Sequence, residues 1–245
     1  DGLFGLRSHE KFVPDWVFSL PKQQVALFVR HIWATDGCVH IDEAGSGRIF
    51  YASTSRRMVD DLARLLGRFN VFTRIKTMRK SGYRDGYHLH IYGAENQLRF
   101  IDEIGVHGAR GGIAERLGAL IREVVPNTNA DTVPVEVWGQ VRGILLEKGM
   151  THREFASAMG TQFCGSTMWK HSPSRERLAK VATVLDSADL EVLATNDVYW
   201  DSIRSIEPIG EQPVYDATVL GVHNFVANGI SMHNSIEQDA DMVIL

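Results

Sequence analysis

The stretch Gln24-Val-Ala-Leu-Phe-Val-Arg-His-Ile-Trp-Ala-Thr-Asp36-Gly37 determines how the N-terminal half of this 245-residue chain folds. Its apolar residues have the spacing of one helical face, and they are Val25, Phe28, Val29, Ile32 and Trp33. Gly37 is a typical helix stop. The pattern therefore predicts a helix over residues 22–36 that ends on the carboxylate of Asp36.

Strands and further helices follow this helix in a regular order. Strands are predicted at residues 38–41 and 48–52, and again at about 70–79 and 86–92. Ser53-Thr-Ser55 can cap a helix between the two strand pairs, and residues 95–104 are predicted to form another helix. The order helix-strand-strand-helix-strand-strand-helix predicts a compact α+β unit.

The second half of the chain has a different pattern. Glycines at 105–112 and the segment 126–134, on either side of a helical stretch near 113–124, favour a domain boundary. Residues from Val135 to about Leu193 are predicted to be wholly helical. Prolines and glycines then separate three short β-like runs, at 202–207, 214–220 and 224–227.

Composition narrows the class of protein. Hydrophobic residues make up 44% of the chain and charged residues 23%, as is ordinary for a globular protein. The net charge of −4 argues against a surface that binds nucleic acid throughout, but it allows local basic patches. Cys38 and Cys164 lie far apart without metal-ligand spacing, so we expect reduced thiols in a cytoplasmic protein.

The two ends of the chain and its apolar runs complete this outline. No apolar run approaches the roughly 18 residues that a membrane span needs, so we expect no membrane association. The first residues, Asp1-Gly-Leu-Phe-Gly-Leu-Arg7, contain neither an initiating methionine nor a signal-peptide pattern. We therefore expect this chain to be a fragment of a longer protein.

The pair His233-Asn234, followed by Ser235, is suited to self-cleavage. The side-chain amide of Asn234 can attack its own backbone carbonyl, close a succinimide and release the segment that begins at Ser235. The imidazole of His233 can protonate the departing amine, and the hydroxyl of Ser235 is a ready acyl acceptor.

The longer string Val214-Tyr-Asp-Ala-Thr-Val-Leu-Gly-Val-His-Asn-Phe-Val-Ala-Asn-Gly-Ile-Ser-Met-His-Asn234 resembles the two C-terminal splicing blocks of inteins. The resemblance implies that Asn234 cyclises with the help of His233, and that Ser235, the first residue of the downstream host segment, accepts the transesterification. It also implies that His223 is the second histidine of these blocks, and that Asp216 tunes the N-terminal steps. These steps need no cofactor.

The last eleven residues, Ser235-Ile-Glu-Gln-Asp-Ala-Asp-Met-Val-Ile-Leu245, differ in character from what precedes them. They are similar to the ATPase-core segment of bacterial replicative DNA helicases of the DnaB family. The resemblance implies that the C-terminal extein is part of a hexameric helicase, of which this chain contains almost nothing.

The opening stretch, residues 24–37, looks like one LAGLIDADG motif of a homing endonuclease, and Lys11-Phe-Val-Pro14 resembles the lysine-bearing block before the second such motif. In that family two helices pack side by side, and each delivers one carboxylate to divalent cations at the scissile phosphates. The resemblance makes Asp36 the candidate ligand of Mg²⁺ and Lys11 the candidate active-site lysine. His31 stands where the family favours a small glycine.

The predicted strands of this unit carry basic residues. The group consists of Arg74, Lys76, Arg79, Lys80 and Arg84, and Asp85 is the only acid from residue 74 to residue 90. The family resemblance implies a saddle of strands in the major groove of double-stranded DNA, where neutralisation of phosphates dominates affinity. A solvated sheet face is the alternative interpretation.

Residues 138–185 resemble a repressor-type helix-turn-helix. Thr151-His-Arg-Glu154 has the form of a capping box, and Thr161–Lys170 is the predicted recognition helix. The N-terminal part of such a helix contacts base edges in DNA-binding members. The residues of suitable type are Gln162, Ser166, Thr167 and Lys170. A helical bundle without a ligand is the alternative.

These patterns together predict an α+β chain with four parts. They are half of a LAGLIDADG endonuclease at 1–125, a small all-α helix-turn-helix insert at 126–198, the C-terminal β strands of a Hint-type splicing domain at 199–234, and the start of the extein at 235–245. The first LAGLIDADG motif and the N-terminal splicing block are missing. We therefore expect an N-terminal intein segment as partner, and no complete splicing by this chain alone.

Two other functions compete with autocatalytic splicing. In the first, the chain is a DNA-binding or endonuclease module with an inert His-Asn-Ser end. In the second, it is a helicase fragment that unwinds DNA. The sequence contains no Gly-x-x-x-x-Gly-Lys-Ser/Thr loop to cradle phosphates, and this argues against the helicase function.

Overall fold

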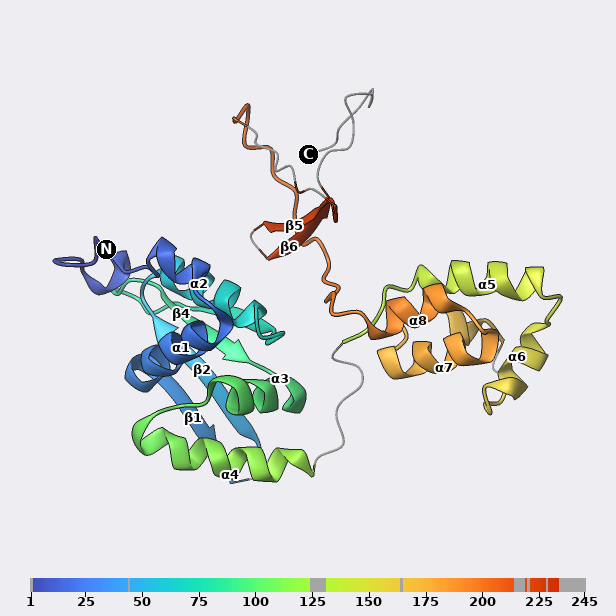
Figure 1. The fold of residues 1–245 in the computed structure, drawn as a ribbon, viewed down its shortest axis with the longest axis horizontal. Helices are drawn as coiled ribbons and strands as arrows, with labels where there is room; N and C mark the ends of the chain where they lie inside the picture. The colour runs from blue at the N-terminus through green and yellow to red at the C-terminus, as the bar shows by residue number, and fades with distance from the viewer. Residues whose placement is uncertain are drawn as a thin grey trace. The chain divides into compact units, whose positions relative to one another are not determined.

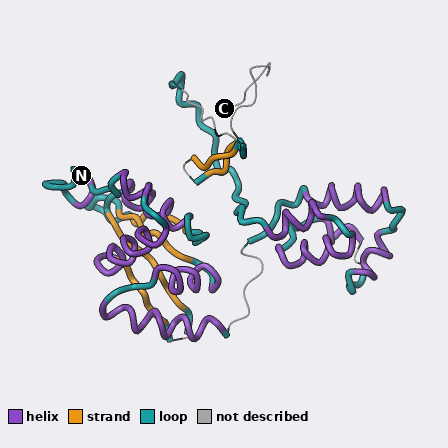
Figure 2. Tube along the Cα trace, in the orientation of Figure 1, coloured by secondary structure: helices purple, strands orange, loops and turns teal. Residues whose placement is uncertain are grey.

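The computed structural model describes residues 2–43, 45–123, 131–163, 165–213, 219, 221–227 and 229–233; of His233 only the backbone is described. The chain divides into two compact units, one built on a sheet and one helical. Figure 1 shows the elements of each unit, and Figure 2 shows where helix and strand alternate. No helix within the described ranges is long and apolar enough to cross a bilayer.

The first unit has the predicted order of helices and strands. Two 3-10 turns, Ser8–Glu10 and Asp15–Ser19, precede the first helix of this unit. The elements that follow are α1 (Lys22–Asp36), β1 (Gly37–Ile41), β2 (Gly47–Ser53), α2 (Arg56–Gly67), β3 (Thr73–Met78), β4 (Gly86–Ile91) and α3 (Ala94–Arg99). After α3 come a π-helical turn (Phe100–Ile104), a 3-10 turn (Gly108–Arg110) and α4 (Gly111–Arg122). Ser55 caps α2 as expected, because its hydroxyl accepts a hydrogen bond from the N–H of Met58 at 3.1 Å.

The four strands form one antiparallel sheet in the order β1-β2-β4-β3. Burial alternates along the strands, so each strand has an inward and an outward set of side chains. The inward set packs with α1, α2 and α4 in one hydrophobic core and includes Val39, Ile49, Tyr51, Leu89 and Ile91. The outward set is partly or fully exposed.

Trp33 and Gly37 fix the junction between α1 and the sheet. The Trp33 ring is fully buried, with its centroid 4.7 Å from that of Phe100 and 5.6 Å from that of Tyr51. A Cβ atom on Gly37 would lie 2.2 Å from Trp33 Cδ1 and 2.4 Å from the Trp33 carbonyl oxygen. Glycine is therefore required for the chain to pass directly from α1 into β1.

The second unit is a helical bundle with its own core. Its helices are α5 (Val137–Glu147), α6 (His152–Ala158), α7 (Arg175–Leu185) and α8 (Ala188–Thr195), with a 3-10 turn at Gly165–Trp169. The predicted capping box is present, because Thr151 and Glu154 exchange hydrogen bonds at the start of α6. These bonds, led by the one from the backbone of Thr151, hold the pKa of the Glu154 carboxyl below its usual value.

The predicted recognition helix over Thr161–Lys170 is wrong. In the described part of this stretch the only helical element is the 3-10 turn from Gly165 to Trp169. Gly165, in the middle of this stretch, has a φ of +63°, a left-handed conformation that interrupts a right-handed helix. Trp169 packs inward instead, with its ring 5.3 Å from that of Trp138 and 6.1 Å from that of Phe155.

The C-terminal strands agree with the sequence only in part. The predicted strand at 202–207 is wrong, because these residues are exposed and have no regular secondary structure. The run at 214–220 lies almost wholly outside the described residues. The third run is confirmed as β5 (Asn224–Ala227), which pairs with β6 (Ile230–His233). Gly229, with φ of +81°, lies in the two-residue connection between them.

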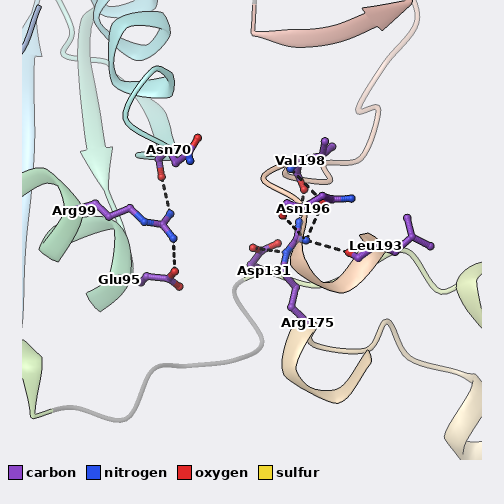
Figure 3. A network of polar contacts seen from close by, with 8 residues as sticks. All are labelled: Asn70, Glu95, Arg99, Asp131, Arg175, Leu193, Asn196 and Val198. Carbon is purple, nitrogen blue, oxygen red and sulfur yellow. Dashed lines mark hydrogen bonds and ion pairs between the residues drawn. The ribbon is translucent and has the colours of Figure 1, made fainter. Parts of the chain in front are cut away.

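Two arginines tie together segments that are distant in sequence (Figure 3). In the first unit, Arg99 donates to the carbonyl of Asn70 at 2.9 Å and pairs with Glu95. In the helical unit, Arg175 donates to Asp131 at 2.7 Å, to the carbonyls of Leu193 at 3.1 Å and Asn196 at 2.9 Å, and to the carbonyl of Val198. Arg175 therefore holds the start and the end of the helical unit together.

We expect Arg175→Ala to destabilise the helical unit by about 2 kcal/mol, because it leaves several partly buried acceptors unpaired. Hydrogen exchange of the full chain should show faster exchange in α7 and α8, whereas the sheet unit should not change. Lys148→Ala, at the exposed end of α5, is the matched loss of one charge. Equal protection in Arg175→Ala and Lys148→Ala would contradict this role of Arg175.

Candidate functional sites

The hairpin formed by β5 and β6 carries the described part of the C-terminal candidate site. His223 directly precedes β5, and its N–H donates to the carbonyl of Val219 at 3.2 Å. Its φ is +54°, a conformation that costs a non-glycine residue about 1 kcal/mol or more. Such a backbone is found where the surroundings enforce it, often at functional sites. The structure thus places an unusual backbone conformation at one of the histidines that the sequence singled out.

The remaining predicted residues of this end lie at or beyond the described range. The backbone of His233 is the last residue of β6, and Asp216, Asn234 and Ser235 fall outside the described residues. Their roles stay predictions.

Asp36, the predicted metal ligand, is the exposed last residue of α1. The hydroxyl of the buried Tyr51 in β2 interacts with the side chains of Asp36 and Thr35. Desolvation, followed by the negative charge of Asp36, raises the pKa of Tyr51 to about 12. Arg110 also lies at this helix end, where it donates to the carbonyl of Ala34 at 2.7 Å. Neither Tyr51 nor Arg110 was predicted from the sequence, since both reach Asp36 or its helix through the fold.

The residues around Asp36 do not make a cation site by themselves. Within the described ranges, no group of three or more His, Cys, Asp or Glu side chains could hold a metal ion. Asp36 alone supplies one carboxylate, whereas a divalent cation such as Mg²⁺ takes several oxygen ligands. Asp36 by itself therefore does not define a metal site for DNA cleavage.

Lys11 has a fixed backbone and an exposed side chain. Two buried residues of the α2 region hold this segment. Ser55 Oγ donates to the carbonyl of Lys11 at 2.5 Å, and Asp61 Oδ2 accepts a hydrogen bond from the N–H of Val13 at 3.1 Å. Arg57 and Arg64 flank Asp61, with N···O distances of 3.8 and 3.4 Å. Asp61 and Ser55 thus position the lysine-bearing segment, a role that their places in the sequence did not indicate.

The predicted basic residues divide between the sheet and a loop. Arg74 and Lys76 lie in β3 on the outward face, whereas Arg79, Lys80 and Arg84 lie in the loop between β3 and β4. Arg79 is 3.9 Å from Asp85, and Lys80 lies over the ring of Tyr83. All five side chains are exposed. Residues 1–126 contain 18 lysines and arginines against 14 aspartates and glutamates, so this unit is the basic part of an acidic chain.

The four predicted contact residues of the helical unit, Gln162, Ser166, Thr167 and Lys170, are also exposed. They lie on or beside the 3-10 turn and not along a recognition helix. Residues 131–198 contain seven lysines and arginines against nine aspartates and glutamates. Geometry and charge therefore favour the sheet over the helical unit as a DNA surface, and contact by the helical unit stays a prediction.

Comparison with known proteins identifies the family. Residues 67–234 match the family model of the intein splicing domain, and residues 23–105 match that of the LAGLIDADG-like domain. The chain therefore belongs to the intein splicing family and carries a LAGLIDADG-like segment.

Three relatives indicate the host. The chain is 42% identical to the replicative DNA helicase DnaB of Synechocystis sp., 41% to that of Nostoc sp. and 40% to that of Rhodothermus marinus. The alignments cover 99%, 100% and 99% of this chain, and 28%, 28% and 26% of those proteins. The chain thus spans about a quarter of each relative, and the similarity fits an intein in a DnaB helicase.

The environment of Tyr51 has a consequence for its titration. Because folding raises this pKa from 10.0 to about 12, the stabilising contribution of the neutral hydroxyl is present below pH 10 and is lost as the pH rises towards 12. In a spectrophotometric titration of the six tyrosines, we expect Tyr51→Phe to remove a component that ionises late. Tyr83→Phe, at a side chain that is 71% exposed, should leave that component in place. A late component that persists in Tyr51→Phe would contradict this assignment.

Proposed function

We propose that this chain is the C-terminal part of an intein that breaks the Asn234–Ser235 bond by cyclisation of Asn234. One observation carries the proposal: the match to the intein splicing domain ends at residue 234, directly before Ser235. The alignments with the helicases cover 99–100% of the chain, including part or all of the eleven residues that follow. This is the pattern expected when an intein is followed by its extein.

In the proposed step, the side-chain nitrogen of Asn234 attacks the carbonyl carbon of the same residue. The side-chain nitrogen gives up one of its two protons and the C–N bond to Ser235 breaks. A succinimide remains on the intein, and the nitrogen of Ser235 takes up one proton and leaves as an amine. An amide is a poor nucleophile, so the rate must come from holding the nitrogen close to the carbonyl. His233 and His223 supply the proton.

The hairpin supports a shared site for His223 and Asn234. A two-residue connection joins strands that run antiparallel. Asn224 at the start of β5 and His233 at the end of β6 therefore lie at the same end of the hairpin. His223 precedes β5 and Asn234 follows β6 in the sequence, so we propose that this histidine assists at the bond that breaks.

The proposed partner is the N-terminal intein segment that carries the first LAGLIDADG motif and the N-terminal splicing block. The exposed segment before the hairpin supports this. Ile203, Ile206 and Ile209 are 78%, 86% and 77% exposed. Three isoleucines this exposed within seven residues offer apolar surface that another segment of the splicing domain could cover. The same host would place the protein in the cytoplasm, and its extein would become part of a hexameric helicase.

The sheet unit is the second part of the proposal. We infer that its outward face binds double-stranded DNA, and that cleavage needs Asp36 together with a carboxylate from a first LAGLIDADG motif. This chain alone should leave DNA intact in the presence of Mg²⁺. A DNA-binding module with an inert splicing end is the competing function.

For the splicing step, we expect Asn234→Ala in the complete intein to abolish release of the downstream segment while permitting acyl transfer to Ser235. His223→Ala and His233→Ala should slow the release without unfolding the domain, because they remove proton donors and not the nucleophile. Mass spectrometry of the products distinguishes these results. Release of an intact segment beginning at Ser235 from Asn234→Ala would overturn the proposed step.

For DNA binding, we expect the triple change Arg74→Ala, Lys76→Ala and Arg79→Ala to weaken duplex affinity across all sequences. The slope of log K against log salt should fall by about one for each phosphate that the variant no longer neutralises. The matched control removes Lys22, Arg116 and Arg122, three exposed cations on α1 and α4. Equal affinity and equal slope in the two triple variants would favour the alternative, in which the sheet face is solvated and does not bind DNA.

A further inference from the structure

The outward face of the sheet carries histidines as well as fixed cations. His40 comes from β1, Arg48 and Phe50 from β2, His88 and His90 from β4, and Arg74 and Lys76 from β3. The four strands contain no aspartate or glutamate. The flanking acids are Asp36 before β1, Asp42 and Glu43 after it, and Asp85 before β4. Asp42 lies 4.0 Å from Arg48, and Asp85 lies 3.9 Å from Arg79.

The strand register places the two central histidines directly beside cations. His90 pairs with Phe50 on one side and with Arg74 on the other. His88 pairs with Ala52 on one side and with Lys76 on the other. Residues opposite each other in an antiparallel pair have Cβ atoms about 5 Å apart, so each imidazole lies next to a positive charge.

The rings on this face also form a continuous ladder. Phe50 stacks on His88 with centroids 5.0 Å apart and an interplanar angle of 9°, and it lies 5.2 Å from His90. His90 stacks on Tyr92 at 5.3 Å. Lys76 and Arg74 in turn lie over the ring of Tyr92, at 5.5 and 5.8 Å. Partial burial, and then Lys76, His88 and Arg48, hold the pKa of His90 below its usual value.

We propose that His90 takes up a proton when this face binds a nucleic-acid duplex, so that affinity for DNA rises as the pH falls. The inference rests on the proposed DNA-binding function of the sheet. Without DNA, protonation of His90 adds a charge beside Arg74 and Lys76 with no acid on the strands to offset it. A phosphate placed against these residues reverses that balance, because an anion favours the charged imidazole.

The direction of the effect follows from linkage. A group whose pKa rises on binding strengthens binding as the pH falls through the pKa of the bound state. The gain levels off below the pKa of the free state. Uptake of one whole proton changes the dissociation constant by at most about tenfold per pH unit, and histidines place this change between about pH 8 and pH 5.

The test measures the affinity of the full chain for a short labelled duplex of mixed sequence, at fixed salt, at about pH 8 and about pH 6. We expect the natural chain to bind several-fold more tightly at the lower pH. In the variant His90→Asn, the ratio between the affinities at the lower and the higher pH should fall close to one. His107→Asn, at an exposed histidine off the sheet that contacts His31, is the matched control and should keep the gain.

Four results would overturn the inference. An equal gain in His90→Asn would assign the pH dependence to other groups, and loss of the gain in His107→Asn would assign it to that residue. Binding that does not depend on pH would show that no proton is taken up, with the DNA surface itself intact. No binding at either pH would remove the proposed DNA surface, and the inference with it. A circular dichroism spectrum shows whether His90→Asn is folded, and His90→Gln serves if it is not.

Discussion

Burial of Trp33 is the interaction on which the sheet unit depends. The indole lies between Phe100 and Tyr51, so it brings α1, β2 and the segment after α3 into contact. Its ring nitrogen has no hydrogen-bond partner among the described residues, which adds a cost that the packing must offset. The same residue forces glycine at position 37. As a result α1 runs directly into β1, and Asp36 lies at the exposed junction.

The sheet that follows this junction has two different faces. On the inner side, aliphatic and aromatic residues bind the helices to the sheet. On the outer side, the same strands are left with arginine, lysine and histidine. Because side chains alternate along a strand, the core fixes the outer surface without contributing to it. The basic surface therefore belongs to the sheet unit, although the chain as a whole is acidic.

The elements with a strong local signal could be predicted from the sequence. Helix 22–36 was confirmed as α1 because both its periodicity and its stop lie within one segment. The strand at 224–227 was confirmed because a short connection leads to its partner. The strand at 202–207 was wrong, since alternation gives no strand without a partner, and no partner strand is present in the described residues. The recognition helix was wrong because the left-handed backbone conformation of Gly165, in the middle of the predicted helix, outweighs the repressor-like pattern.

The roles of the candidate site residues stay predictions, and their surroundings could not be predicted from the sequence. Chemical type and position in a motif indicated Asp36, Lys11 and His223. Tyr51 contacts Asp36, and Asp61 and Ser55 hold the segment of Lys11. These contacts join residues up to about fifty positions apart, and a sequence pattern does not report them. The histidines of β4 lie within the strand predicted at 86–92, but their neighbours in β2 and β3 follow only from the register.

The central claim concerns one peptide bond. The most direct measurement combines this chain with the N-terminal intein segment and determines the exact masses of the products. We expect an intein product that ends at Asn234 as a succinimide, lighter by one water molecule than the hydrolysed form, and a downstream segment that begins at Ser235. An uncut Asn234–Ser235 bond in a folded and assembled complex would contradict the account, as would a break at any other position.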